Sequence, residues 1–394
     1  MTNSPLEGIR IVEQGTFITG PCAGMMLADL GADVIKVESP EGDPYRSYQG
    51  EQYSPHFQAY NRNKRSIALD LKASSDRNLF DSLIKDADVF IQNFRPGTAA
   101  RLGAGHERLH ALNPRLIYTS ISGFGSSGPY VNRPSYDSVA QALSGFLSVV
   151  VDTSRPRFLG PALADAITGI YAAYGVLGAL VQRGRTGVGS LVEVSMLEAM
   201  AHFAVEPFAA FFALGSTPTS SDRPRLAQAY ILRTADARLI ALHLSSLEKF
   251  WDGLVTALNA PELASDERFN PRTARIANYE ELNEELDRRF AQRDLAHWVQ
   301  ELGRNDVPYA PINSIDEVIR DPQVEHLGLI VPVEAAQSGT QAVRPPVQFG
   351  GARGMSVRAA PGLDQHGAAI RESLERDAAW PGLTEARTGA TQPL

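Results

Sequence analysis

The N-terminal part of the chain alternates a short apolar strand, a helix and a second strand, and this alternation constrains the fold more than any other feature. Residues 9–13 and 33–38 are predicted strands, and residues 22–30 between them are a predicted helix that ends at Gly31. A strand, a helix and a second strand in this order form a βαβ unit, in which the two strands lie parallel. The sequence therefore predicts an α/β fold with an open, mostly parallel sheet.

Later segments at residues 66–71, 89–93 and 115–121 are predicted to extend this sheet. In open α/β sheets, ligands bind beyond the carboxyl ends of the strands. Lys72 follows the first of these segments, and Arg101 lies shortly after the second. Cations near neighbouring strand ends of an acidic chain indicate a bound polyanion, although a solvated charged rim has the same pattern.

Composition limits the possible functions. The 394 residues are enough for two domains, and 37 Lys and Arg against 45 Asp and Glu give a net charge of −8, which argues against nucleic-acid binding. Cys22 is the single cysteine, as expected in a reducing cytoplasm, and the N-terminus lacks the pattern of a secretory signal. The apolar run at residues 167–181 is interrupted by Gly and is predicted to be too short to span a bilayer. No histidine stands at a metal-ligand spacing, so no metal site is expected.

Asp165 precedes that apolar run, in which large side chains recur every three or four residues as on a buried helical face. An Asp in this place is expected at or near the N-cap, where free amides and the helix dipole favour a carboxylate. The same amides can donate hydrogen bonds to an oxyanion formed beside the carboxylate. The residues alone leave two roles open for Asp165, a helix cap and a nucleophile.

Residues 123–128 read G-x-G-x-x-G after a predicted strand, as in dinucleotide-binding enzymes. Pro129 comes next, so no helix is expected to begin there, and the fingerprint requires a helix N-terminus for the pyrophosphate. We interpret the segment as an active-site loop whose amides are free to donate.

A change of composition marks a domain boundary. Residues 216–223 are rich in Ser and Thr, as in a linker. We predict the N-terminal part of a large α/β domain over residues 1–215 and a smaller domain over residues 225–325. Residues 331–394 are expected to return to the large domain and to end in a flexible tail.

Short motifs over nearly the whole chain occur in the order typical of one enzyme family. They lie at residues 20–21 with 30–38, 42–44, 61–67, 87–97, 120–125, 160–169, 186–189 with 192–195, 306–308, 313–315 and 317–318. On these motifs the chain resembles the family III CoA-transferases, also called the CaiB/BaiF family, which include formyl-CoA:oxalate and carnitine CoA-transferases and the α-methylacyl-CoA racemases.

The resemblance implies a Rossmann-like large domain built from both chain ends, a smaller α+β domain and a homodimer of two interlocked rings. It implies that Asp165 is the catalytic nucleophile, that coenzyme A or acyl-CoA is a substrate, and that no cofactor is tightly bound. The implied CoA contacts, together with a glycine expected to hold an oxyanion, are Leu69, Lys72, Asn93, Phe94, Thr98, Arg101 and Gly123.

Departures from the family patterns limit the activities that are expected for this chain. Ile18 stands where the formyl-CoA branch has Gln, and residues 216–223 replace that branch's run of glycines, which argues against formyl-CoA:oxalate transfer. The racemases have a catalytic His in a Gly-His-Asp triplet, where this chain has Ser135, Tyr136 and Asp137. Because a phenol is a poor base near neutral pH, we predict a transferase. The alternatives are a racemase that moves the Cα proton and a non-catalytic acyl-CoA-binding protein.

The acids are less well specified. The family favours succinyl-CoA as the donor and aspartyl anhydride and aspartyl-CoA thioester intermediates. The acceptor is expected to be a free carboxylic acid, with dicarboxylic and hydroxy acids as the candidates. Candidates for binding a second carboxylate, because a guanidinium fits it bidentately, are Arg46, Arg133, Arg155 and Arg157.

Overall fold

The computed structural model describes residues 4–49, 52–152, 154–158, 160–246, 248–353, 356–377 and 380–382. The chain divides into two compact units. The first contains residues 1–146, 158–205 and 328–394, and the second contains residues 147–157 and 206–327.

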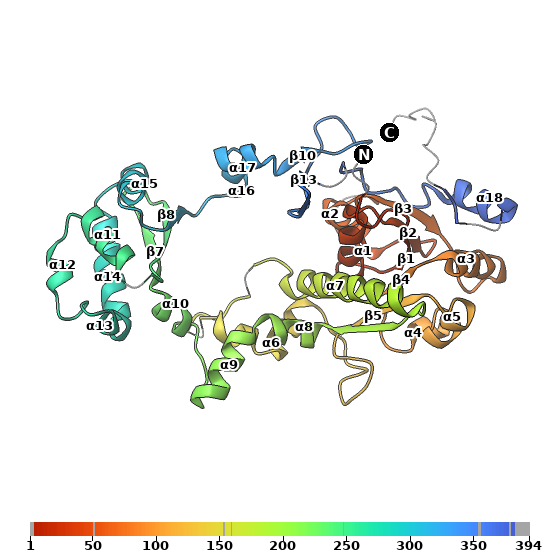
Figure 1. Cartoon of the computed structure of the whole chain (residues 1–394), viewed down its shortest axis with the longest axis horizontal. Helices are drawn as coiled ribbons and strands as arrows, with labels where there is room; N and C mark the ends of the chain where they lie inside the picture. The colour runs from red at the N-terminus through yellow and green to blue at the C-terminus, as the bar shows by residue number, and fades with distance from the viewer. Residues whose placement is uncertain are drawn as a thin grey trace. The chain divides into compact units, whose positions relative to one another are not determined.

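A six-stranded sheet forms the centre of the first unit (Figure 1). Its strands are all parallel and lie in the order β3-β2-β1-β4-β5-β6, the order of a doubly wound fold. The predicted α/β class and parallel sheet are confirmed. The strands are β1 (Arg10–Gln14), β2 (Asp33–Glu38), β3 (Lys64–Ala68), β4 (Val89–Gln92), β5 (Ile117–Ser122) and β6 (Leu191–Ser195).

Helices cover both faces of this sheet because both faces of most of its strands are apolar (Figure 1). One face packs against α1 (Thr19–Asp29) and α7 (Leu163–Thr186). The other packs against α3 (Ser74–Asp86), α5 (His106–Leu112) and α18 (Gly367–Asp377). The remaining helices of this unit are η1 (Pro44–Ser47), α2 (Pro55–Asn61), α4 (Thr98–Arg101), α6 (Asp137–Leu143) and α8 (Met196–Phe203).

The C-terminal segment completes the β3 edge of the sheet. The Ala68 amide donates to Asp364 Oδ1 at 2.8 Å, and Arg371 Nη2 donates to the Ala68 carbonyl at 2.6 Å. The His366 amide donates to the Ser66 carbonyl at 3.1 Å, and the Ser66 amide donates to His366 Nδ1 at 3.2 Å. Residues 300 positions apart therefore share the hydrogen bonds of one edge strand. Short strand pairs precede this segment at β10 (Ile330–Pro332) with β11 (Gln341–Val343) and β12 (Gln348–Phe349) with β13 (Ala352–Arg353).

Helix α7 approaches α1 very closely at Gly169. A Cβ atom at this position would lie 2.6 Å from Cys22 Cβ and 2.9 Å from the Thr19 carbonyl oxygen. Only a residue without a side chain fits against that backbone.

We expect Gly169→Ala to destabilise the protein by about 1–3 kcal/mol, because the added methyl group forces α1 and α7 apart. Gly178→Ala on the same helix is the matched control, since a Cβ there meets no atom within 4 Å. The control should stabilise by about 0.5–1 kcal/mol through helix propensity. Urea unfolding midpoints measure both changes, and equal shifts for the two variants would contradict the close approach.

The apolar run at residues 167–181 was predicted to be too short to cross a membrane. This prediction is wrong about length, because the run lies within α7, which has 24 residues. By length and composition, α7 qualifies as a span, and so does the bent pair of α8 and α9 (Val205–Leu214). Core helices of globular proteins meet the same criterion, and α7 packs against α1 and the sheet.

The second unit is built on a three-stranded antiparallel sheet in the order β7-β8-β9, with β7 (Ala229–Arg233), β8 (Leu239–His243) and β9 (Tyr309–Pro311). Helices pack on it through an apolar cluster that includes Trp251, Phe290 and Trp298. They are α11 (Lys249–Ala257), α14 (Tyr279–Phe290) and α15 (Leu295–Arg304). Shorter helices along this part of the chain are α10 (Asp222–Ala227), α12 (Glu262–Ser265), α13 (Arg272–Ala277), α16 (Ile315–Val318) and α17 (Pro322–Leu327), and η2 (Phe146–Val149) begins at the last residue before the unit boundary at 146.

Candidate active site

Asp165 lies in the first turn of α7, two residues after the helix begins at Leu163. The N-cap residue is Ala162, so Asp165 lies near the cap, as predicted, but is not the cap itself. Among the described residues, the half-buried Asp165 carboxylate accepts no hydrogen bond from the protein. Its oxygens are therefore available to a substrate.

A second carboxylate performs the capping instead. Asp137, the first residue of α6, accepts the Ala164 amide at 2.7 Å and the Asp165 amide at 3.3 Å through Oδ1. Its other oxygen accepts from Gln141 Nε2 at 2.7 Å. Burial, and then the charge of Asp137, raise the pKa of Asp165 to about 7. A carboxylate of raised pKa is a more basic nucleophile, but it is protonated in mild acid.

We expect kcat/KM for the reaction at Asp165 to fall as the pH drops below about 7, because only the carboxylate form attacks. Asp137→Asn removes the neighbouring charge, so the acidic limb of the profile should move to lower pH. The free energy of unfolding depends on pH in the opposite sense. The folded chain retains the Asp165 proton that the unfolded chain releases near pH 4, so the stabilisation from this proton is lost as the pH rises through 7. Rate profiles for both proteins measure the shift, and an unmoved limb would contradict the coupling.

Aromatic and apolar side chains surround this end of α7. Phe17 contacts Tyr136 edge-on, with ring centroids 6.2 Å apart, and Tyr45 at 5.7 Å. Phe17 and Tyr60 also pack against a buried cluster that contains Ile18 and Tyr45. Burial, followed by smaller effects of neighbours that include Asp165, raises the pKa of Tyr45 to about 12. The Asp165 carboxylate therefore lies close to a buried cluster of aromatic and apolar side chains.

A cavity of about 450 Å³ lies at the carboxyl ends of β1, β2 and β3, where a parallel sheet is expected to bind ligands. Gly15 and Thr16 follow β1 at its wall, and Phe17 and Ile18 continue the same loop into the aromatic cluster near Asp165. The loop at residues 15–18 thus joins the cavity to the surroundings of the carboxylate.

The sequence-predicted CoA contacts are only partly brought together. Leu69, Lys72 and Phe94 line the cavity. The Asn93 side chain instead fixes the loop after β1: Oδ1 accepts the Thr16 amide at 2.9 Å, and Nδ2 donates to the Thr16 carbonyl at 2.8 Å.

Thr98 and Arg101 lie on α4 outside the set of cavity-lining residues, and Arg101 Nη2 donates to Thr98 Oγ1 at 2.7 Å. Gly123 follows β5, and a Cβ there would lie 2.4 Å from Ser135 Cβ, next to Tyr136 and Asp137. The Gly125 amide, predicted to be free, donates to Ser122 Oγ at 2.9 Å. No helix begins between these glycines and Asp137, which confirms the prediction that the segment lacks the helix N-terminus of a dinucleotide-binding fingerprint.

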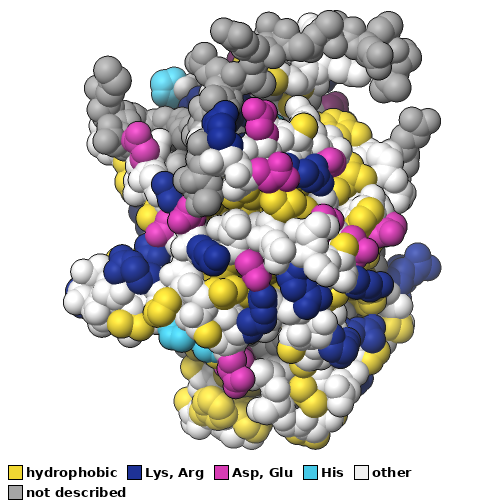
Figure 2. Space-filling view, turned by 90° about the vertical axis from the view of Figure 1, so that its right-hand side faces the viewer, with side chains coloured by type: hydrophobic (Ala, Val, Ile, Leu, Met, Phe, Trp, Pro, Cys, Tyr) yellow, Lys and Arg dark blue, Asp and Glu magenta, His cyan; other side chains and the backbone are white. Residues whose placement is uncertain are grey.

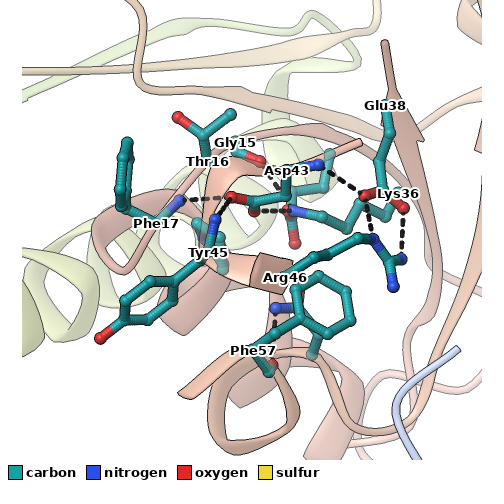
Figure 3. A network of polar contacts seen from close by, with 12 residues as sticks. Gly15, Thr16, Phe17, Lys36, Glu38, Asp43, Tyr45, Arg46 and Phe57 are labelled. Carbon is teal, nitrogen blue, oxygen red and sulfur yellow. Dashed lines mark hydrogen bonds and ion pairs between the residues drawn. The ribbon is translucent and has the colours of Figure 1, made fainter. Parts of the chain in front are cut away.

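A buried ion network lies beneath the loop at residues 15–18 (Figure 3). Lys36 Nζ contacts Glu13 Oε1 at 2.9 Å, Asp43 Oδ2 at 3.0 Å and the Gly15 carbonyl at 2.7 Å. Asp43 Oδ1 accepts the amides of Phe17 and Tyr45, whose rings touch. Phe17 has a φ of 59°, which is unfavourable for a large side chain, so the network stabilises a strained turn.

Arg46 belongs to the same network, which corrects its prediction as a substrate ligand. It is fully buried, donates to both oxygens of Glu38 at 2.7 Å and stacks 3.8 Å from the centre of the Phe57 ring (Figure 3).

The other predicted arginines lie elsewhere. Arg133 lies over the rings of Phe124 and Tyr130, and the exposed Arg155 and Arg157 belong to the second unit. On the face that Figure 2 presents, Lys and Arg side chains gather in a band across the middle of the view.

A doubly wound parallel sheet with a cavity at the carboxyl ends of its strands is typical of α/β enzymes that bind a sizeable ligand there. The sequence profile of CoA-transferase family III matches residues 6–367, and the chain belongs to this family. The family model and the names of the relatives support CoA transfer and do not favour the racemase alternative.

Relatives and solved structures agree with the assignment. The succinate–glutarate CoA-transferase of Agrobacterium fabrum is 36% identical over 94% of this chain and 96% of its own length. The acetyl-CoA:oxalate CoA-transferase of Acetobacter aceti is 33% identical over the same shares of the two chains. The crystal structure of a CaiB/BaiF family protein from Brucella suis has a TM-score of 0.85 and 36% identity, and covers 95% of this chain and 100% of its own.

Proposed function

We propose that this CoA-transferase moves CoA from succinyl-CoA to a free dicarboxylic acid, with Asp165 as the nucleophile. The observation that carries the role of Asp165 is its carboxylate at the start of α7, which has no protein partner among the described residues because Asp137 binds the helix amides. The donor and acceptor are inferred from relatives named succinate–glutarate and succinyl-CoA:glutarate CoA-transferases.

The proposed reaction preserves the energy of the thioester through covalent intermediates. A carboxylate oxygen of Asp165 attacks the donor carbonyl, the C–S bond breaks, and CoA leaves as a thiolate, which gives a mixed anhydride. The thiolate then attacks the aspartyl carbonyl, so the donor acid leaves as a carboxylate and an aspartyl-CoA thioester remains.

The acceptor carboxylate repeats these steps in the reverse sense. It attacks the aspartyl thioester, releases the thiolate and forms a second anhydride. Attack of the thiolate on the acceptor carbonyl gives the new acyl-CoA and regenerates the Asp165 carboxylate. Every nucleophile is already an anion, so the scheme needs no general base, metal or bound cofactor. The amide of Gly123 is our candidate for holding the oxyanions.

Trapping tests the scheme. Hydroxylamine added during turnover should convert Asp165 to a hydroxamate, and borohydride should reduce the aspartyl-CoA thioester to an alcohol. Peptide mass spectrometry should then find the modified residue at position 165, and a label at another residue would reject Asp165 as the nucleophile.

A panel of free acids with succinyl-CoA or acetyl-CoA as donor, read by mass spectrometry, identifies the substrates. Exchange of a Cα proton for deuterium without an acceptor acid would instead favour a racemase.

The interlocked homodimer of the family is also part of the proposal. Its support is the set of large apolar side chains that a single chain leaves exposed. Tyr174 on α7 is 73% exposed, and Phe212 on α9 is 78% exposed. Light scattering should give the mass of two chains, and a stable monomer would contradict the assembly.

A further inference from the structure

The cavity at the strand ends combines an apolar wall with a side-chain amide at the end of the central strand, and charged side chains lie elsewhere in its lining. Its apolar lining comes from strands, loops and a helix end on one face of the sheet, namely Val37, Leu69, Leu71, Phe94 and Leu102. Gln14, the last residue of β1, is also part of the lining. An apolar wall with one side-chain amide beside it suits a flat ring that carries hydrogen-bonding groups on its edge.

The oxygen of the Gln14 amide is not satisfied by the described part of the protein. The residue is only 8% exposed, and its Oε1 is buried without a hydrogen-bond partner among the described residues. Its register partner Gln92 differs: Nε2 donates to Ser120 Oγ at 2.9 Å, and Oε1 accepts the Phe94 amide at 2.8 Å. A buried amide oxygen without a partner is unfavourable, and such groups occur where a ligand supplies the missing bond.

We infer that Gln14 binds the edge of the adenine ring of CoA, an inference that rests on the proposed function. Adenine carries an amino donor next to a ring-nitrogen acceptor, and a glutamine amide matches this pair with one acceptor and one donor. Rotation about the last torsion of Gln14, which is soft, exchanges the positions of its amide oxygen and nitrogen. The apolar lining contacts the ring faces.

Charge supports this orientation of the ligand. Of the carboxylates in the lining, Glu38 and Asp43 are paired with Arg46 and Lys36, whereas Glu41 and Asp70 form no ion pair among the described residues, so they disfavour a phosphate in the cavity. Lys72 also lines it and is exposed, which provides a cation for a phosphate outside. The neutral base of CoA therefore occupies the cavity, with its phosphates toward solvent.

The test combines one change in the protein with one change in the ligand. In 1,N6-etheno-CoA the adenine amino group is tied into a third ring, so it no longer donates to Gln14. Wild-type protein should bind this analogue about tenfold more weakly than CoA in isothermal titration calorimetry. Gln14→Leu should bind CoA about tenfold more weakly and should no longer distinguish CoA from the analogue.

Pantetheine, which lacks the nucleotide, should bind wild type and Gln14→Leu equally. Gln300→Leu, on the exposed side of α15 in the second unit, is the matched control and should change none of these affinities. The comparison of CoA with etheno-CoA on the wild type needs no variant, so it decides the matter even if Gln14→Leu folds poorly.

Three results would overturn the inference. One is equal binding of CoA and etheno-CoA by the wild type, and another is unchanged discrimination in Gln14→Leu. The third is a parallel loss of pantetheine affinity in that variant, which would place the pantetheine arm at Gln14 instead. Trapping of an acyl group on Asp165 together with any of these outcomes would leave the proposed function intact, whereas failure of the wild type to bind either CoA or pantetheine would overturn both proposals.

Discussion

Asp165→Ala is expected to lower the rate of CoA transfer by at least about three orders of magnitude, because the variant has no group on which the anhydride and thioester can form. The fold should persist. The Asp165 carboxylate is half-buried and near Asp137, and its raised pKa shows that the folded state disfavours its charge. At pH 8 the variant should therefore be at least as stable as the wild type.

Steady-state assays with succinyl-CoA and the best acceptor measure this loss, and calorimetry with CoA verifies that binding remains. Asp165→Glu is the informative companion, since it keeps a carboxylate but moves it by one methylene, and it should retain partial activity. Near-normal transfer by Asp165→Ala would reject the covalent scheme altogether.

Lys36→Met should produce the largest loss of stability, about 3–5 kcal/mol. Methionine matches the length of lysine but carries no charge, so the fully buried Glu13 would keep only Lys64 as an ionic partner, and Asp43 would lose the ion pair with Lys36. The surrounding carboxylates overcome the cost of burial and hold the pKa of Lys36 above its ordinary value, so its charge persists at every pH of interest.

Denaturant midpoints at neutral pH measure the effect, and Lys72→Met serves as the matched control because Lys72 is exposed. The control should leave stability nearly unchanged while weakening CoA binding. If Lys36→Met unfolds at the same denaturant concentration as the control, the network contributes little. If it remains folded but binds CoA poorly, the loop at residues 15–18 depends on the network for its shape.

The sheet was predictable because local signals define it. Apolar runs flanking a helix and a glycine required parallel strands, and β1, β2, β4 and β5 form close to their predicted places. The third strand was predicted at residues 66–71 and forms at 64–68. Leu69 and Leu71 lie beyond the end of β3, where they belong to the hydrophobic core and also line the cavity.

The site was less predictable because its contacts join distant parts of the chain. Asp137 reaches the start of α7 across 27 residues, and nothing in the local pattern of α6 indicates that its first carboxylate binds another helix. Lys36 alternates with Ile35 and Val37, as an ordinary charged residue on an exposed face does, so its complete burial depends on neighbours from other strands and loops. Asn93 lies within a recognisable motif and Arg46 lies just after one, yet their side chains support the backbone.

The hydrogen bonds between β3 and residues 364–371 affect the order in which the protein matures on the ribosome. Synthesis reaches β3 early, but the segment that covers its outer edge emerges only after the complete second unit has been made. Until then the nascent polypeptide presents an open strand edge, which is prone to wrong pairing. Expression of fragments that stop before residue 364 should accordingly yield aggregates, and chaperones should associate with the growing chain throughout that interval.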